Sequence, residues 1–138
     1  MRVATLIGAG FVLFAAMDLV WLGIVANSFY RSELGPVITL GQGLKYSHYL
    51  AGAVTWLLIA LGAVCFVLPR AHEGAGVSAA AAWGALLGLV IYGVYDSTNL
   101  AVLRGWTLKA AVVDVVWGTF ACAVLGMLLF SLDRWLFR

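Results

Sequence analysis

Long apolar segments, separated by short polar connections, set the pattern of this chain. Each segment is near the ~20 residues that cross a bilayer as a helix, and the breaks carry charged residues, glycine or proline. The pattern predicts an all-α fold: one integral membrane domain over residues 1–138, built as an antiparallel up-down four-helix bundle. The predicted helices cover about residues 3–26, 46–68, 78–103 and 107–132.

The connections between these segments indicate the topology. The second connection begins at Pro69, which we expect to end the second helix because proline has no backbone N–H to donate. The third is only residues 104–106, so helices three and four should form a tight hairpin. Small residues also recur four apart in these helices, a spacing that lets membrane helices approach closely. They are Gly84 and Gly88 in helix three, and Gly118, Cys122 and Gly126 in helix four.

Composition narrows the class of protein. Hydrophobic residues make up 64% of the chain and charged residues 10%, whereas soluble domains carry about 25% charged residues. The apolar stretch that ends near Ala26 is longer than the core of about 7–15 residues in a signal peptide, so we expect a retained first helix. The net charge of +2 is spread along the chain, and without a basic stripe no nucleic-acid partner is predicted.

Basic residues flank both ends of the predicted bundle and bias its orientation only slightly. The even number of helices puts both termini on one side of the membrane. The basic residues divide equally between the two sides, so the positive-inside rule does not decide. We favour cytoplasmic termini, because Arg134 and Arg138 closely flank the end of the last helix. The two groups are Arg2, Arg70, Arg134 and Arg138, against Arg31, Lys45, Arg104 and Lys109.

Three aspartates, Asp18, Asp96 and Asp114, fall inside predicted membrane helices. A charged side chain at mid-membrane costs about 3 kcal/mol on insertion scales, so such residues serve a function or act as fixed polar joints between helices. Asp18 and Asp114 each precede a tryptophan by three residues, Trp21 and Trp117, on the same helix face. An inverted duplication is one reading of this repeated Asp-x-x-Trp pattern.

The polar residues of all four helices fall in the half of the membrane next to the first and third connections. At 1.5 Å per residue, Asp18, Asp96 and Asp114 lie about 13, 10 and 8 Å deep. The other half is almost uniformly apolar. We therefore predict a polar pocket or water-filled vestibule that opens on the side of these connections. Its predicted lining is Asp18, Trp21, Tyr95, Asp96, Asn99, Asp114 and Trp117, with His48, Tyr46 and Arg104 as auxiliary residues.

Each candidate residue also has a purely structural interpretation. The aspartates could accept hydrogen bonds from indole, tyrosine or His48 donors, and His48 could instead exchange a proton with one of them. Trp106 and Trp135 suit the membrane interface, while Trp56 and Trp83 suit packing or lipid contact. No metal is predicted, because no His-x-x-x-His or Glu-x-x-His spacing occurs. No nucleophile or nucleotide-binding motif is present, and no cofactor is indicated.

Several motifs follow one another in a fixed order. Residues 17–23 read Met-Asp-Leu-Val-Trp-Leu-Gly, residues 95–101 read Tyr-Asp-Ser-Thr-Asn-Leu-Ala, and residues 113–118 read Val-Asp-Val-Val-Trp-Gly. Between them lie Phe29-Tyr30-Arg31, Leu34-Gly35 and Leu103-Arg104-Gly105-Trp106. This ordered set resembles a bacterial family catalogued as domain of unknown function 2177, and the resemblance covers nearly the whole chain.

The resemblance implies a four-helix protein of the bacterial inner membrane without an established activity. It also implies an association with genes for lipid-modifying methyltransferases and photolyase-like proteins, and hence a link to fatty-acyl modification or photo-oxidative stress. At the start of helix two, that family has Asn followed by small residues, where this chain has Gly43-Leu44-Lys45-Tyr46-Ser47-His48. No role for His48 therefore follows from the resemblance.

Three functional hypotheses remain open at this point. The first is a membrane protein that binds a small or lipidic ligand, or handles a proton, in the carboxylate-lined pocket. The second is a membrane enzyme or accessory subunit in lipid modification, with an aspartate as acid or base. The third is a structural subunit in which the aspartates only join helices. The lipid bilayer is the predicted partner in all three, and a homodimer or a partner membrane protein fits a chain of this size.

Overall fold

The computed structural model describes residues 1–39 and 43–137 of the chain. Within these ranges the regular elements are all helices, with no strand, which confirms the predicted all-α class. In the described part of the chain, four helical stretches are long and apolar enough to cross a membrane: Arg2–Val25, Tyr46–Glu73, Val77–Val102 and Leu108–Phe137. The number of predicted spans is therefore confirmed.

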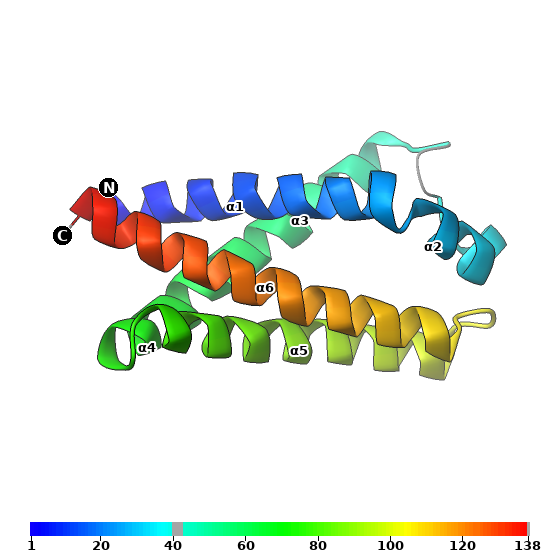
Figure 1. The fold of residues 1–138 in the computed structure, drawn as a ribbon. Coiled ribbons are helices and arrows are strands. Elements are labelled where there is room, and N and C mark those ends of the chain that lie inside the picture. The colour runs from blue at the N-terminus through cyan, green and yellow to red at the C-terminus, as the bar shows by residue number, and fades with distance from the viewer. Residues whose placement is uncertain (40–42, 138) are drawn as a thin grey trace.

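The helices lie roughly along one long axis (Figure 1). Helix α6 (Leu108–Phe137) lies between α1 (Arg2–Val20) and α5 (Val77–Val102), and α3 (Tyr46–Gly62) crosses behind them at an angle. The pair α5–α6 makes the most extensive contact, and α1 packs against both α3 and α6. The N and C termini lie at the same end of the molecule (Figure 1).

The first span, Arg2–Val25, is followed by a short helix that the sequence analysis did not predict. A π-helical turn at Trp21–Val25 follows α1, and the residues after Ala26 form a short helix, α2 (Asn27–Leu34), and a 3₁₀ turn at Gly35–Val37. The backbone N–H of Ala26 donates to the carbonyl of Trp21 (2.7 Å), and Nδ2 of Asn27 donates to the carbonyl of Leu22 (2.9 Å). These bonds satisfy carbonyls that a helix end would otherwise leave free, so the chain can re-enter a helix at once.

The prediction that Pro69 ends the second helix was wrong. A π-helical turn at Ala63–Val67 follows α3 and leads directly into α4 (Leu68–Glu73), with Pro69 in its first turn. Proline lacks an N–H and its ring needs space against the preceding turn, and a π turn widens the helix at that point. Nη1 of Arg70 donates to the carbonyl of Phe66 (3.0 Å). The span therefore continues to Glu73.

Small residues let α5 and α6 approach each other closely. A Cβ added to Gly84 would overlap the carbonyl oxygen of Cys122, and one added to Gly88 would overlap that of Gly118. At Gly126 the added Cβ would lie 2.5 Å from the carbonyl oxygen of Ala80. The two backbones are thus close enough to exclude any side chain at these positions.

The end of the molecule with the termini carries a buried charged cluster that the sequence analysis missed. Asp133 is fully buried and accepts two hydrogen bonds from Arg2, at Nε (2.7 Å) and Nη2 (2.6 Å). Nε2 of His72 lies 2.7 Å from Oδ2 of Asp133. The cluster joins α1, α4 and α6, so the prediction of an almost uniformly apolar second half was wrong. Helix α6 runs to Phe137, and Asp133 faces inward on its last turns.

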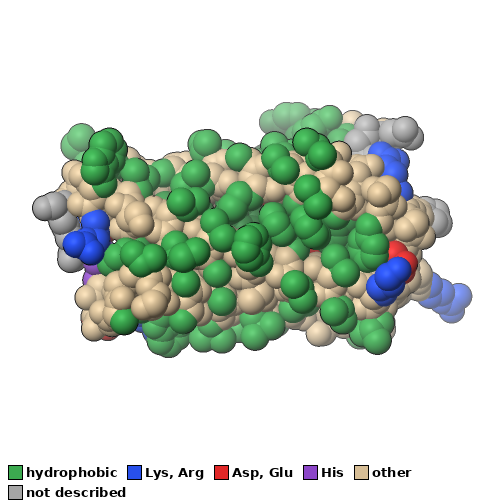
Figure 2. Space-filling view, in the orientation of Figure 1, with side chains coloured by type: hydrophobic (Ala, Val, Ile, Leu, Met, Phe, Trp, Pro, Cys, Tyr) green, Lys and Arg blue, Asp and Glu red, His purple; other side chains and the backbone are tan. Residues whose placement is uncertain are grey.

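The surface agrees with a position in the bilayer. Figure 2 shows apolar side chains along the length of one face and Lys and Arg side chains at its two ends. Large apolar residues such as Leu19, Leu58 and Val94 are about 60% exposed (59%, 59% and 64%). An exposed apolar surface of this extent is unfavourable in water and favourable in lipid.

Candidate functional site

Asp18, on the last turn of α1, receives two indole hydrogen bonds. Nε1 of Trp56 in α3 donates to Oδ2 (2.9 Å), and Nε1 of Trp117 in α6 donates to Oδ1 (3.4 Å). Both carboxylate oxygens therefore have a donor, and the three helices are joined at this residue. Trp56, expected only in packing or lipid contact, is a partner of Asp18.

Asp114, near the start of α6, is bound by a residue of the short helix α2. The hydroxyl of Tyr30 donates to Oδ1 of Asp114 (2.5 Å), and Nε1 of Trp21 donates to the Tyr30 oxygen (3.3 Å). Burial, and next the negative charge of Asp114, raise the pKa of Tyr30 above its ordinary value of 10.0. Tyr30 therefore keeps its proton and acts as a donor to the carboxylate.

The two Asp-x-x-Trp motifs interlock across the bundle. The rings of Trp21 and Trp117 are stacked, with centroids 4.4 Å apart and planes 2° from parallel. Trp117 donates to Asp18 of the other motif, and Trp21 reaches Asp114 of the other motif through Tyr30. The motifs thus have different surroundings: Asp18 faces two indoles, whereas Asp114 faces the phenol of Tyr30 and the carboxyl group of Asp96.

Replacing Tyr30 by phenylalanine should lower the free energy of unfolding by about 1.5–3 kcal/mol, the usual range for a hydrogen bond to a charged group. The change leaves Oδ1 of Asp114 without its donor and adds no volume. Denaturation by sodium dodecyl sulfate, followed by circular dichroism, measures the loss. Tyr49→Phe is the matched control, because Tyr49 is 63% exposed. Equal stability of the two variants would contradict a stabilising Tyr30–Asp114 bond.

Charged residues hold α2 in place. Oε1 of Glu33 accepts a hydrogen bond from Nζ of Lys109 (2.9 Å), and Oε2 accepts one from the hydroxyl of Thr107 (3.1 Å). The hydrogen bond from Lys109, and then that from Thr107, hold the pKa of Glu33 below its ordinary value of 4.5. Glu33 is therefore ionised at neutral pH, and α2 is attached to the start of α6 at two points, Tyr30 and Glu33.

Asp96 is the least satisfied of the three aspartates. Its side chain is only 1% exposed, and Nε1 of Trp106 donates to its Oδ1 (3.0 Å). No donor among the described residues reaches Oδ2. The side chains of Asp96 and Asp114 are nevertheless close enough to interact with each other. A direct hydrogen bond between two carboxyl groups needs a proton on one of them. Trp106, expected at the membrane interface, is a partner of Asp96.

A cavity of about 240 Å³ is lined by the carboxylates of Asp18 and Asp114 but not by Asp96, and α2 forms part of its wall. A second hollow of about 230 Å³ lies between α3 and α5. Tyr92, Tyr95 and Asp114 line both, so the two spaces meet at these residues. The remaining lining of the cavity is Asp18, Leu22, Tyr30, Leu34, Ile38 and Trp106, and that of the hollow is Thr55, Ile59 and Ile91.

The other residues predicted for the site are distributed unevenly. Tyr95 borders both spaces and is 53% exposed. Asn99 is half-buried, and its Nδ2 atom is buried without an acceptor among the described residues. His48, Tyr46 and Arg104 are exposed. Nδ1 of His48 accepts a hydrogen bond from the backbone N–H of Lys45 (2.9 Å), which caps the start of α3.

Four aromatic residues of the site were absent from the predicted lining: Tyr30, Trp56, Tyr92 and Trp106. A partial signal existed for two of them. Tyr92 precedes Tyr95 and Asp96 by three and four residues, on the same helix face, and Tyr30 follows the first span closely. The need of each buried carboxylate for donors was also visible. Which indole supplies a donor depends on the packing of helices distant in sequence, and no spacing rule gives that.

Residues 3–131 match the model of a family described as "Predicted membrane protein (DUF2177)". No curated protein and no solved structure matches the chain.

Proposed function

The chain belongs to the DUF2177 family of predicted membrane proteins, and from this premise we propose a function in binding. We propose that the protein lies in the bacterial inner membrane and binds a small ligand at the Asp96–Asp114 carboxyl pair. The ligand donates hydrogen bonds or carries a positive charge. The four spans cross the bilayer in alternating directions, with both termini in the cytoplasm.

One observation carries this proposal: a buried carboxylate oxygen without a protein donor, next to a second carboxylate that lines a cavity. An unpaired polar atom away from water costs about 1–3 kcal/mol, and more when it is charged. Oδ2 of Asp96 is such an atom, and Asp114 borders the cavity. A protein maintains this arrangement at a cost in stability, which favours a functional role. A proton shared by the pair, or a donor group of a ligand, removes the cost.

The lining of the cavity indicates the class of ligand. None of its described lining residues is lysine or arginine, while Asp18 and Asp114 are both among them. Such a lining attracts cations and hydrogen-bond donors and repels anions. A volume of about 240 Å³ is that of roughly eight water molecules at ~30 Å³ each. The ligand, or the part of it that enters, is therefore small.

Three probes of similar size and different charge test this proposal: ethanolamine, ethylene glycol and glycolate. At neutral pH, ethanolamine should raise the thermal unfolding midpoint of the detergent-solubilised protein, ethylene glycol should raise it less, and glycolate should leave it unchanged. A ligand stabilises the state that binds it. Asp114→Asn should remove the difference, whereas Glu73→Gln, which removes an exposed carboxylate, should preserve it. No effect of ethanolamine, or an equal effect on Asp114→Asn, would refute the assignment.

A structural role is the better proposal for Asp18 alone. Both of its oxygens have indole donors, which supports a fixed joint between helices rather than a binding group.

Catalysis on lipids is a second proposal for the Asp96–Asp114 pair, supported by the hollow between α3 and α5 that reaches Asp114. There an aspartate would act as acid or base. An unchanged lipid profile after deletion of the gene would count against that second proposal.

A further inference from the structure

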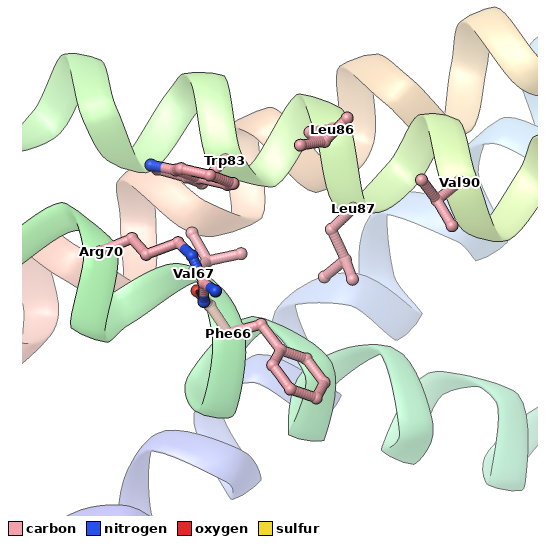
Figure 3. A pocket seen from close by; sticks show the side chains of 7 residues that line it. All are labelled: Phe66, Val67, Arg70, Trp83, Leu86, Leu87 and Val90. Carbon is pink, nitrogen blue, oxygen red and sulfur yellow. Dashed lines mark hydrogen bonds between the residues drawn. The ribbon is translucent and has the colours of Figure 1, made fainter.

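An apolar hollow lies on the outside of the bundle, between the turn Ala63–Val67 with α4 on one side and α5 on the other (Figure 3). Its volume is about 230 Å³. Leu87 and Val67 border it on the two sides, and Phe66 and Val90 are 60% and 54% exposed. Among the described residues, its lining is Phe66, Val67, Arg70, Trp83, Leu86, Leu87 and Val90.

Arg70 places one positive charge at one end of this hollow. Figure 3 shows Arg70 beside Trp83 at one end and Val90 at the other. The guanidinium carbon lies 4.9 Å from the Trp83 ring centroid, and one N–H donates to the carbonyl of Phe66 (3.0 Å). A guanidinium carries five N–H donors, and Arg70 is exposed. Its other donors are therefore available to an anion outside the bundle.

The outer hollow leads along α5 toward the carboxylate cavity. Val90 borders the outer hollow, and its neighbour Ile91 borders the hollow between α3 and α5. Leu87, Ile91 and Tyr95 are four residues apart and lie on one face of α5. From Trp83 to Tyr95 the helix rises about 18 Å, more than half of the ~30 Å hydrocarbon core. The row of hollows thus reaches from the end of α5 near α4 to Asp114.

We infer that this row of hollows holds one anionic phospholipid, with its phosphate at Arg70 and an acyl chain along α5 toward the Asp114 cavity. The apolar walls lie within spans that face the bilayer, and arginine pairs with phosphate through parallel N–H donors. The acyl chain would meet the small ligand at Tyr92, Tyr95 and Asp114. The inference deepens the proposed function by naming a lipid that reaches the same site. Only the placement of the acyl chain's methyl end, near Asp114, rests on that function.

Native mass spectrometry of the full-length protein tests the headgroup contact. Phosphatidylglycerol and phosphatidylcholine with identical acyl chains are added separately, and the dissociation constant of the first bound lipid is compared. Phosphatidylglycerol should bind about tenfold more tightly, a preference of the size that one charge contact supplies. Arg70→Gln should abolish this preference. Arg104→Gln, which removes an exposed arginine in the connection between α5 and α6, should retain it. A preference that survives Arg70→Gln would overturn the inference.

A photoactivatable phosphatidylglycerol tests the path of the acyl chain. With a diazirine in the half of the acyl chain farther from the headgroup, adducts should form on the peptides that contain Ile59 and Ile91. Val90→Trp should remove these adducts by filling the hollow, while Val94→Trp should keep them, because Val94 lies outside the lining of both hollows. Adducts that persist in Val90→Trp would refute the path. Cross-linked dimers through α5 in place of lipid adducts would assign the groove to a second copy of the chain.

The two proposals fail in different ways. Asp114→Asn should lose the response to ethanolamine and keep the preference for phosphatidylglycerol, because Asp114 lies at the far end of the row from Arg70. Arg70→Gln should lose the lipid preference and keep the response to ethanolamine. If Asp114→Asn instead abolished the lipid preference, headgroup binding at Arg70 would be wrong.

Discussion

Replacing Gly88 by alanine should lower the free energy of unfolding by about 1–3 kcal/mol, the usual cost of inserting a methyl group into a well-packed interface. The added Cβ would overlap the carbonyl oxygen of Gly118 and lie 2.9 Å from the Cβ of Cys122. A backbone carbonyl cannot rotate away as a flexible side chain can. Helices α5 and α6 would therefore have to separate, and dispersion contacts along both would weaken.

Gly93 on the same helix supplies the matched control, because a Cβ added there meets nothing within 4 Å. Gly93→Ala should be neutral or slightly stabilising, since alanine is a better helix former than glycine. Unfolding of both variants by sodium dodecyl sulfate, followed by circular dichroism, gives the two free energies. If Gly88→Ala were as stable as Gly93→Ala, the close α5–α6 contact would not contribute to stability.

The four spans were predictable because each is a run of apolar residues near the length that a bilayer requires. The helix boundaries were less so. Pro69 is a strong helix-breaking signal by itself, but the π turn before it depends on how α3 and α4 pack. Residues 27–34 have the composition of a connection, and their helix is held by Tyr30 and Glu33 through contacts with α6. Tertiary contacts of this kind leave no periodic pattern in a short segment.

The carboxylates of the site were predictable, and most of their partners were not. Asp18, Asp96 and Asp114 stand out because charges in apolar segments are rare. Asp18 and its partner Trp56 are 38 positions apart, and helix rotation decides which of several tryptophans faces a carboxylate. Asp133 was missed for a different reason. It follows the last apolar segment, where an acidic residue is ordinary. Its burial and its contact with Arg2 are visible only in the folded structure.

Infrared spectroscopy should detect one protonated carboxyl group shared by Asp96 and Asp114 at neutral pH. Oδ2 of Asp96 is buried with no protein donor among the described residues, and the side chains of Asp96 and Asp114 are close enough to interact. Two like charges close together in a buried site repel each other, and one proton relieves the repulsion. The carboxylic acid C=O stretch, which shifts in D₂O, is the signal to measure in the membrane-embedded protein.

Asp96→Asn and Asp114→Asn should each remove this band, because an amide can supply the missing donor and no proton is then needed. Asp18→Asn should keep it, since Asp18 has its own two indole donors. If the band disappeared in Asp18→Asn alone, the proton would belong to Asp18, where α1, α3 and α6 meet. That result would refute a proton shared by Asp96 and Asp114. The distinction matters for function. A pair that holds one exchangeable proton can release it when a cationic ligand arrives, and ligand binding would then lead to proton release in proportion to the sites filled.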